Sequence, residues 1–93
     1  MTIAQRLISE AASIFDTTER DILSHSKFME HRLARNAVCY AARHFGEHLK
    51  TIGRDMAGRH HTTILSNSRW AVAHLKRDPT FAARVNLLLG SIK

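Results

Sequence analysis

The sequence predicts an all-α fold, a compact bundle of about six short helices that contains a helix-turn-helix. Apolar residues recur every three or four positions along most of the chain, which is the spacing of amphipathic helices. No long stretch alternates apolar and polar residues, and one proline with four glycines leaves little room for hairpins. A polar run that follows Gly58 indicates a tight turn between two helices. The 93 residues are expected to form a single domain over residues 1–93.

The first two helices are expected in an acidic N-terminal segment. Thr2 can cap a helix that ends near Asp16, and its apolar positions follow the helical repeat at Ile3, Leu7, Ile8, Ala11, Ile14 and Phe15. A second, short helix is expected through about Leu23, because Thr18 and Asp21 have the spacing of a capping box.

A loop over residues 24–28, which carries Lys27, should lead into a longer third helix. This helix is expected from about Glu30 to Phe45, with an inward stripe of Leu33, Ala34, Ala37, Val38, Ala41 and Phe45. Gly46 should end it, since glycine is favoured just after the last helical residue.

Three further helices are expected in the second half of the chain. The fourth is short, over about residues 49–56. The fifth follows the turn at Gly58 and covers about residues 60–76, with Ile64, Leu65, Ser68, Ala71, Val72 and Leu75 on its inward stripe. Asp78-Pro79 combines an N-cap with proline at the first helical position and predicts a last helix through Leu89.

Positive charge is concentrated after the N-terminal quarter of the chain. The sequence has 14 basic and 8 acidic residues, a net charge of +6 with histidine neutral. Residues 1–24 contribute −2, from two basic and four acidic residues, and the remainder contributes +8, from twelve basic and four acidic residues. This distribution favours a polyanionic partner such as nucleic acid, and a basic face kept for solubility is the alternative.

Several classes of function find no support in the sequence. No signal peptide or long apolar run is present, so we expect a cytoplasmic protein without a membrane partner. Cys39 has no second cysteine to pair with and is expected to be a buried apolar residue. His44 and His48 could share a helix face, but Gly46 should separate them and no further ligands complete a metal site. No catalytic arrangement or phosphate-binding loop is present, so we expect neither an enzyme nor a cofactor, metal or nucleotide.

The start of the fifth helix carries the most informative polar residues. A helix that enters the major groove of DNA presents its first turn to the base edges. Thr62 and Thr63 can donate hydrogen bonds to bases and pack their methyl groups on thymine, while His60 and His61 can donate or accept. Arg59 can contact guanine or a phosphate with two N–H groups. The alternative is that this run of residues only caps the helix.

The spacing of three short segments carries a family signature, namely Ile52-Gly53, Gly58-Arg59 and His61-Thr62-Thr63-Ile64. Together they resemble the C-terminal DNA-binding domain of the bacterial replication initiator DnaA. In that family an isoleucine-glycine pair precedes a glycine-arginine-aspartate-histidine-threonine-threonine run. Upstream, Ile22-Leu23-Ser24 is similar to the end of the second short helix of the family, so the resemblance covers about residues 5–90.

The resemblance implies a set of DNA contacts. Lys27 stands in the loop from which the family inserts an arginine into the minor groove of an AT-rich site, the DnaA box. Arg35 matches an arginine that touches DNA, and Asn36 replaces a glutamine beside it. Arg43 matches a residue that binds backbone phosphate, and Lys50 lies at a turn near the backbone. The histidine and two threonines of the signature match the groove-reading residues of the recognition helix.

Three departures from the family pattern bear on specificity. His60 replaces an aspartate that can cap the helix and contact a base, Asn67 replaces a small alanine, and Trp70 replaces a polar surface residue. We therefore expect general DNA binding to persist and an unaltered preference for the DnaA box to be lost.

The sequence supports two functional hypotheses. The first is a stand-alone protein that binds double-stranded DNA at DnaA-box-like sites and regulates replication initiation or transcription, possessing no ATPase domain of its own. A helix capped immediately after Met1 favours a complete small protein over an excised domain. The second hypothesis is a protein-interaction adaptor that keeps the fold and contacts a replication or regulatory protein through exposed Phe28, Met29 and Trp70.

Overall fold

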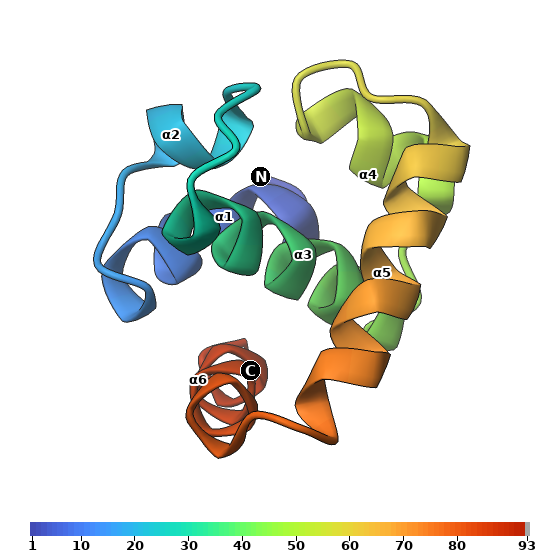
Figure 1. Ribbon diagram of the computed structural model, residues 1–93. Coiled ribbons are helices and arrows are strands. Elements are labelled where there is room, and N and C mark those ends of the chain that lie inside the picture. The colour runs from blue at the N-terminus through green and yellow to red at the C-terminus, as the bar shows by residue number, and fades with distance from the viewer. Residues whose placement is uncertain (93) are drawn as a thin grey trace.

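The computed structural model describes residues 1–92 (Figure 1). This part of the chain contains six helices and no strand: α1 (Ile3–Ile14), α2 (Glu19–Leu23), α3 (Met29–His44), α4 (Leu49–Asp55), α5 (His61–Leu75) and α6 (Pro79–Gly90). The predicted all-α fold is confirmed, and most predicted boundaries differ from these by one residue or less. The radius of gyration is 11.4 Å, close to the value of about 12 Å for a compact chain of this length.

The first two helices begin at threonine caps, as predicted. The Thr2 hydroxyl accepts a hydrogen bond from the Gln5 N–H at 3.1 Å, and the Gln5 side chain accepts one from the Thr2 N–H at 2.9 Å. At α2 only half of the expected capping box forms: the Thr18 hydroxyl accepts from the Asp21 N–H at 3.1 Å. The Asp21 carboxylate lies 3.4 Å from Nε2 of His31 instead.

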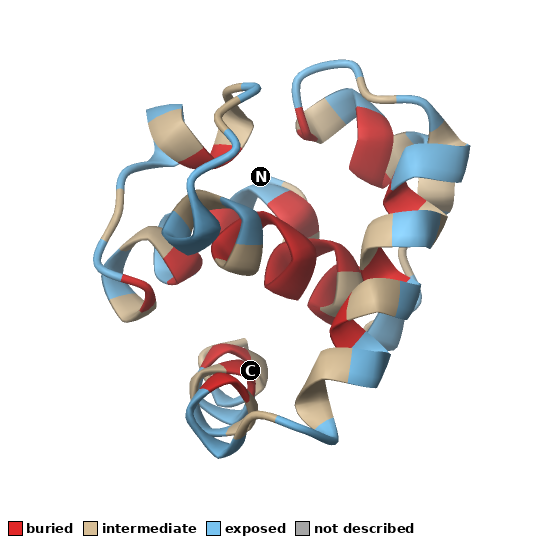
Figure 2. Ribbon diagram, viewed as in Figure 1, coloured by how far each residue is buried: buried red, intermediate tan, exposed pale blue. Residues whose placement is uncertain are grey.

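Helix α3 forms the centre of the molecule and packs against the other five helices. Figure 2 shows this helix as the most continuously buried one. Small side chains on several of its faces allow α1 and α5 to approach closely, and its buried residues are Ala34, Arg35, Asn36, Ala37, Val38, Cys39, Ala41 and Ala42. The position of α3 therefore buries Arg35 and Asn36, for which the family resemblance implied contacts with DNA.

The inward stripe of α5 is narrower than predicted. Ile64, Ser68 and Ala71 are buried and lie on one line along the helix. Val72 was expected on this stripe but is 42% exposed. The prediction was wrong because eight helical positions after Ile64 rotate a side chain by about 80° away from that line. Leu65 is only half-buried.

Helix α6 is joined to the rest of the molecule through aromatic contacts. As predicted, Asp78 is its N-cap, and the Asp78 carboxylate accepts hydrogen bonds from the N–H groups of Thr80 and Phe81 at 3.0 and 3.2 Å. The Phe81 ring lies 6.1 Å from the Phe15 ring at the end of α1. It also meets the ring of Trp70 edge-on at 6.1 Å.

The turn between α4 and α5 depends on two glycines for different reasons. Ala57 and Gly58 both have positive φ angles, 63° and 73°, which reverse the chain after α4. Gly53 lies inside α4, where its carbonyl accepts a hydrogen bond from the Arg59 N–H at 2.9 Å. A Cβ atom on Gly53 would lie 2.2 Å from the Arg59 carbonyl oxygen. The turn can therefore lie against α4 only because residue 53 has no side chain.

Candidate nucleic-acid interface

A histidine caps the helix whose first turn carries the family signature. His60 is the N-cap of α5, with φ −65° and ψ 147°, and its Nδ1 accepts a hydrogen bond from the Thr62 N–H at 3.2 Å. Nδ1 also lies 2.7 Å from the Thr62 hydroxyl. The imidazole thus fills the capping position expected for an aspartate, and it does so only while Nδ1 is unprotonated. The His61 ring packs against it, with ring centres 4.2 Å apart.

The first turn of α5 directs its polar side chains to solvent. Thr62 and Thr63 are exposed and His61 is half-exposed, whereas Ile64 is fully buried and fixes the rotation of the helix. The helix therefore presents one imidazole and two hydroxyls on its outer side. This exposure meets the first condition for reading a groove.

The Arg59 guanidinium connects the α4–α5 turn to the loop between α2 and α3. Its Nη1 donates to the carbonyl oxygens of Met56 at 2.7 Å and Leu23 at 3.2 Å. Its Nη2 donates to the carbonyl of Ser24. Burial lowers the pKa of the Arg59 guanidinium below its ordinary value, although an arginine still remains charged. These bonds hold the two segments side by side, and Figure 1 shows them at the same end of the molecule.

Arg35, on α3, bonds the same loop. It is only 7% exposed, and its Nε, Nη1 and Nη2 donate to the carbonyls of Ile22, Ser26 and Asp21 at 2.8, 3.1 and 3.2 Å. Burial lowers the pKa of Arg35, and the nearby charge of Arg59 lowers it further. The two arginines together satisfy the carbonyl groups at the end of α2, where cations are favoured.

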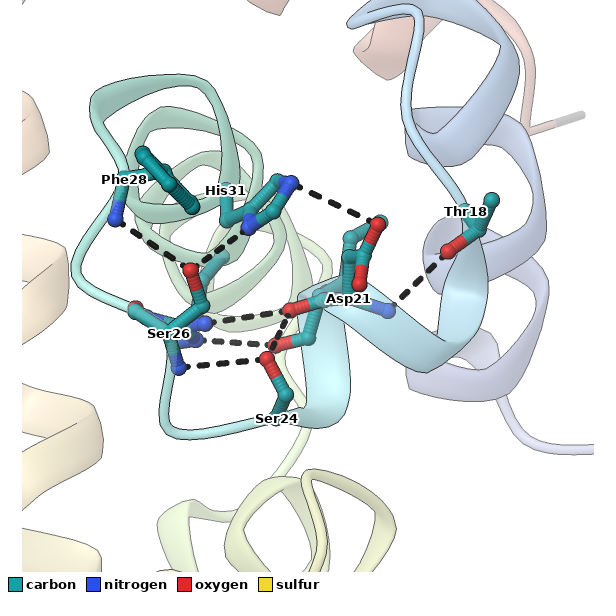
Figure 3. Close-up of polar contacts among 8 residues, drawn as sticks. Thr18, Asp21, Ser24, Ser26, Phe28 and His31 are labelled. Carbon is teal, nitrogen blue, oxygen red and sulfur yellow. Dashed lines mark hydrogen bonds and ion pairs between the residues drawn. The ribbon is translucent and has the colours of Figure 1, made fainter.

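Side-chain hydroxyls hold the rest of the α2–α3 loop (Figure 3). The Ser24 hydroxyl donates to the Asp21 carbonyl at 2.8 Å and accepts from the Ser26 N–H at 3.1 Å. The Ser26 hydroxyl accepts from the Phe28 N–H at 3.2 Å and lies 2.7 Å from Nδ1 of His31. Sequence reasoning did not find this network, although two serines spaced by two residues are typical of serine-stabilised turns.

The other predicted contact residues lie in different surroundings. Lys27 is exposed on the α2–α3 loop, and Lys50 is exposed in the first turn of α4. Arg43 is exposed near the end of α3, where its Nη1 donates to the Ser68 hydroxyl of α5 at 3.3 Å. Asn36 is only 5% exposed. A contact of Asn36 with DNA, expected from the resemblance, would thus require its side chain to leave the interior.

Two residues of α5 that depart from the family pattern, Asn67 and Trp70, pack against neighbouring side chains. Trp70, expected to be exposed, is half-buried because its ring stacks on His74 at 4.5 Å and meets α6. The Asn67 amide lies 3.8 Å from the Cys39 sulfur. As predicted, Cys39 is buried, and this burial raises the pKa of its thiol to about 11.

Two other kinds of feature, a metal site and a membrane-spanning helix, can be checked over residues 1–92. Gly46, with φ 87°, follows α3 and lies between His44 and His48, as predicted. No group of three or more histidine, cysteine, aspartate or glutamate side chains in the described part of the chain could hold a metal ion. Within the same residues, every helix is too short or too polar to cross a membrane.

The comparison with protein families agrees with this arrangement. The model of the bacterial dnaA protein helix-turn-helix matches residues 4–70, from the first turn of α1 to the middle of α5. The matched segment contains the Ile-Gly pair, the turn, the recognition-helix start and the α2–α3 loop, and α6 lies beyond it. A search among curated proteins returned no significant match. The chain thus belongs to the bacterial DnaA helix-turn-helix family, which is a DNA-binding and not a catalytic family.

Proposed function

We propose that this protein binds double-stranded DNA at DnaA-box-like, AT-rich sites and thereby regulates replication initiation or transcription. The observation that carries the proposal is the first turn of α5, where Thr62, Thr63 and the half-exposed His61 face solvent just after Arg59, the residue that bonds the α2–α3 loop. In the major groove, threonine hydroxyls can bond base edges and their methyl groups can pack on thymine. The free N–H groups of this helix start favour a phosphate nearby.

Exposed cations around this turn would supply contacts with the DNA backbone. Arg43 and Lys50 are exposed on α3 and α4, which both pack against α5, and Lys27 is exposed on the α2–α3 loop, which Arg59 bonds. We assign Arg35 and Arg59 the role of positioning the α2–α3 loop, because their guanidinium groups donate to carbonyls of residues 21–26. Their direct contact with DNA stays a prediction.

The salt dependence of binding separates these two roles. Each phosphate neutralised contributes about −0.9 to the slope of log affinity against log salt concentration. Three contacts give a slope of about −3, whereas five contacts, with both arginines on phosphates, give about −4.5. A slope near zero would contradict DNA binding through charge altogether. The measurement is fluorescence anisotropy of a labelled AT-rich duplex from low to moderate salt.

His60 is the residue on which we expect an altered specificity to depend. Its imidazole caps α5, so it occupies the place of a family aspartate without that residue's negative charge. Bound duplexes selected from a random pool should therefore differ between the wild type and His60→Asp. The control is Asn86→Asp on the exposed side of α6, which introduces the same charge away from the turn. Identical enrichment by wild type and His60→Asp would contradict the role of His60.

The adaptor hypothesis keeps one supporting observation. Phe28 is 72% exposed and Met29 is 52% exposed, and such side chains are typical of protein contacts when they cluster. A gel-shift experiment at low salt, with box-containing and random duplexes, distinguishes the hypotheses. Retarded bands with the box-containing duplex support DNA recognition, and the absence of a shift with either duplex supports the adaptor.

A further inference from the structure

The largest exposed aromatic side chain lies at the end of the α2–α3 loop, at the N-cap of α3. Phe28 is 72% exposed and follows Lys27 directly, and the two residues line a surface hollow together with Ser26. Met29, at the start of α3, extends the apolar surface and is 52% exposed. An aromatic ring in this position contributes little to the core, and together with Met29 it forms an exposed apolar patch of the kind that can contact a partner.

The loop presents this ring in a fixed position. The Phe28 N–H donates to the Ser26 hydroxyl, and the Phe28 ring meets the His31 ring edge-on, with centres 5.7 Å apart. Figure 3 shows the ring beside His31, where the hydrogen-bonded loop enters α3. The backbone that carries it is bonded to two arginine guanidinium groups from α3 and the α4–α5 turn. Little conformational entropy therefore remains to be lost when the ring is inserted into a partner.

The position of the loop relative to α5 indicates where the ring meets DNA. Arg59, the residue that precedes the cap of α5, bonds the carbonyls of Leu23 and Ser24 where the loop leaves α2. When the start of a recognition helix lies in the major groove, an adjacent segment reaches the flanking phosphates and the next minor groove. Lys27 beside the ring and Arg32, exposed one turn into α3, provide charge that is complementary to those phosphates.

We propose that Phe28 is an apolar wedge that enters the minor groove, partly unstacks one base step and kinks the duplex. The inference rests on the proposed DNA binding and adds a residue that selects DNA by its deformability. Apolar side chains that enter the minor groove kink DNA by about 20–90° towards the major groove. Steps such as TA unstack most readily, so the wedge favours AT-rich sites that contain such a step.

The test uses the full chain and a duplex that carries the sequence enriched from the random pool. Fluorophores at the two ends report bending by energy transfer, and 2-aminopurine placed at successive adenines reports unstacking. The wild type should bend the duplex and raise 2-aminopurine fluorescence at one step. Phe28→Ala should remove both signals and weaken binding about tenfold, while Phe28→Leu should keep much of the bend.

Two controls separate the wedge from other effects. Leu87→Ala removes a side chain of α6 that is 64% exposed at the end of the molecule away from the loop, and should change neither signal. Lys27→Ala should weaken binding and reduce the salt slope by about 1 while the bound complex stays bent. Circular dichroism establishes that each variant is folded.

Three outcomes would contradict the proposal or its basis. A wild-type complex that is tight, salt-dependent and straight would overturn the wedge and leave DNA binding standing. A Phe28→Ala complex as bent as the wild type would also overturn it. A wild type that binds no duplex at low salt would contradict the proposed function itself, and the exposed ring would then fit the adaptor hypothesis.

Discussion

Replacing Gly53 with alanine tests whether close contact between α4 and the turn fixes the start of α5. The new Cβ would lie 2.2 Å from the carbonyl oxygen of Arg59, about 1 Å short of an ordinary carbon–oxygen contact. The obstacle is backbone and not a flexible side-chain end, so the turn has to move away from α4. That movement lengthens the hydrogen bond from the Arg59 N–H to the Gly53 carbonyl, now 2.9 Å.

The expected change in the free energy of unfolding for Gly53→Ala is the sum of opposing contributions. Alanine is favoured over glycine inside a helix by about 1 kcal/mol. Overpacking of this kind costs about 1–3 kcal/mol, and a weakened backbone hydrogen bond costs about 1 kcal/mol. We therefore expect Gly53→Ala to lower the free energy of unfolding by about 2 kcal/mol, which corresponds to a fall in Tm of about 10 °C for a domain of this size.

The assay is urea unfolding monitored by circular dichroism. The control is a glycine whose replacement with alanine is expected to stabilise the protein. Nothing lies within 4 Å of a Cβ built on Gly90, the last residue of α6. Gly90→Ala should therefore raise stability, by up to about 1 kcal/mol. A midpoint for Gly53→Ala at or above that of the wild type, with an unchanged m-value, would refute the reasoning.

Three other changes have definite expected outcomes. Arg59→Lys keeps the charge but replaces the two separate guanidinium nitrogens with a single ammonium, which cannot span the carbonyls that Nη1 and Nη2 reach. It should therefore lower stability by about 1–2 kcal/mol in urea unfolding and weaken DNA binding without altering the salt slope. The hydrogen bond from the Phe81 N–H is the main cause that lowers the pKa of the Asp78 carboxyl below its usual 3.8. The ionised carboxylate should therefore stabilise the fold above pH 3.8, and this stabilisation should be lost as the pH falls through the lower pKa of the folded state. In thermal unfolding measured against pH, Asp78→Ala should not show this loss. Because burial raises the pKa of Cys39 to about 11, its thiol should resist an aromatic disulfide reagent at pH 8 and react only in denaturant.

Local signals in the sequence were sufficient to predict the helices. Thr2, Thr18 and Asp78 cap their helices as expected, and Gly46 and Gly58 follow the ends of α3 and α4. These features act within a few residues of the chain, so their effects can be read without knowledge of distant contacts. The exception is Val72, whose exposure depends on how much of α5 the neighbouring helices cover.

The roles of the arginines could not be predicted in the same way. Arg35 lies in a stretch of α3 that is buried on several sides, and only the packing of α1 and α5 against this helix reveals it. Arg59 bonds carbonyls that precede it by more than thirty positions. Net charge counts both residues as available to DNA, while the folded chain uses their donors on its own backbone. Sequence reasoning thus singled out both arginines but could not show which carbonyls they bond, and their contact with DNA stays a prediction.

These connections make the α2–α3 loop and the start of α5, the two segments proposed to contact DNA, parts of one unit. Arg59 lies one residue before the cap of α5, and the same guanidinium binds the loop that carries Lys27 and Phe28. A shift of either segment would break hydrogen bonds to a partly buried charged group, which costs more than breaking neutral ones. Under the proposed DNA binding, the spacing between the start of α5 and the loop is therefore set before DNA arrives, and it would constrain the distance between the two grooves that a site must offer. If that constraint operates, Arg59→Lys should relax sequence preference at both ends of the selected site together, and not at one end alone.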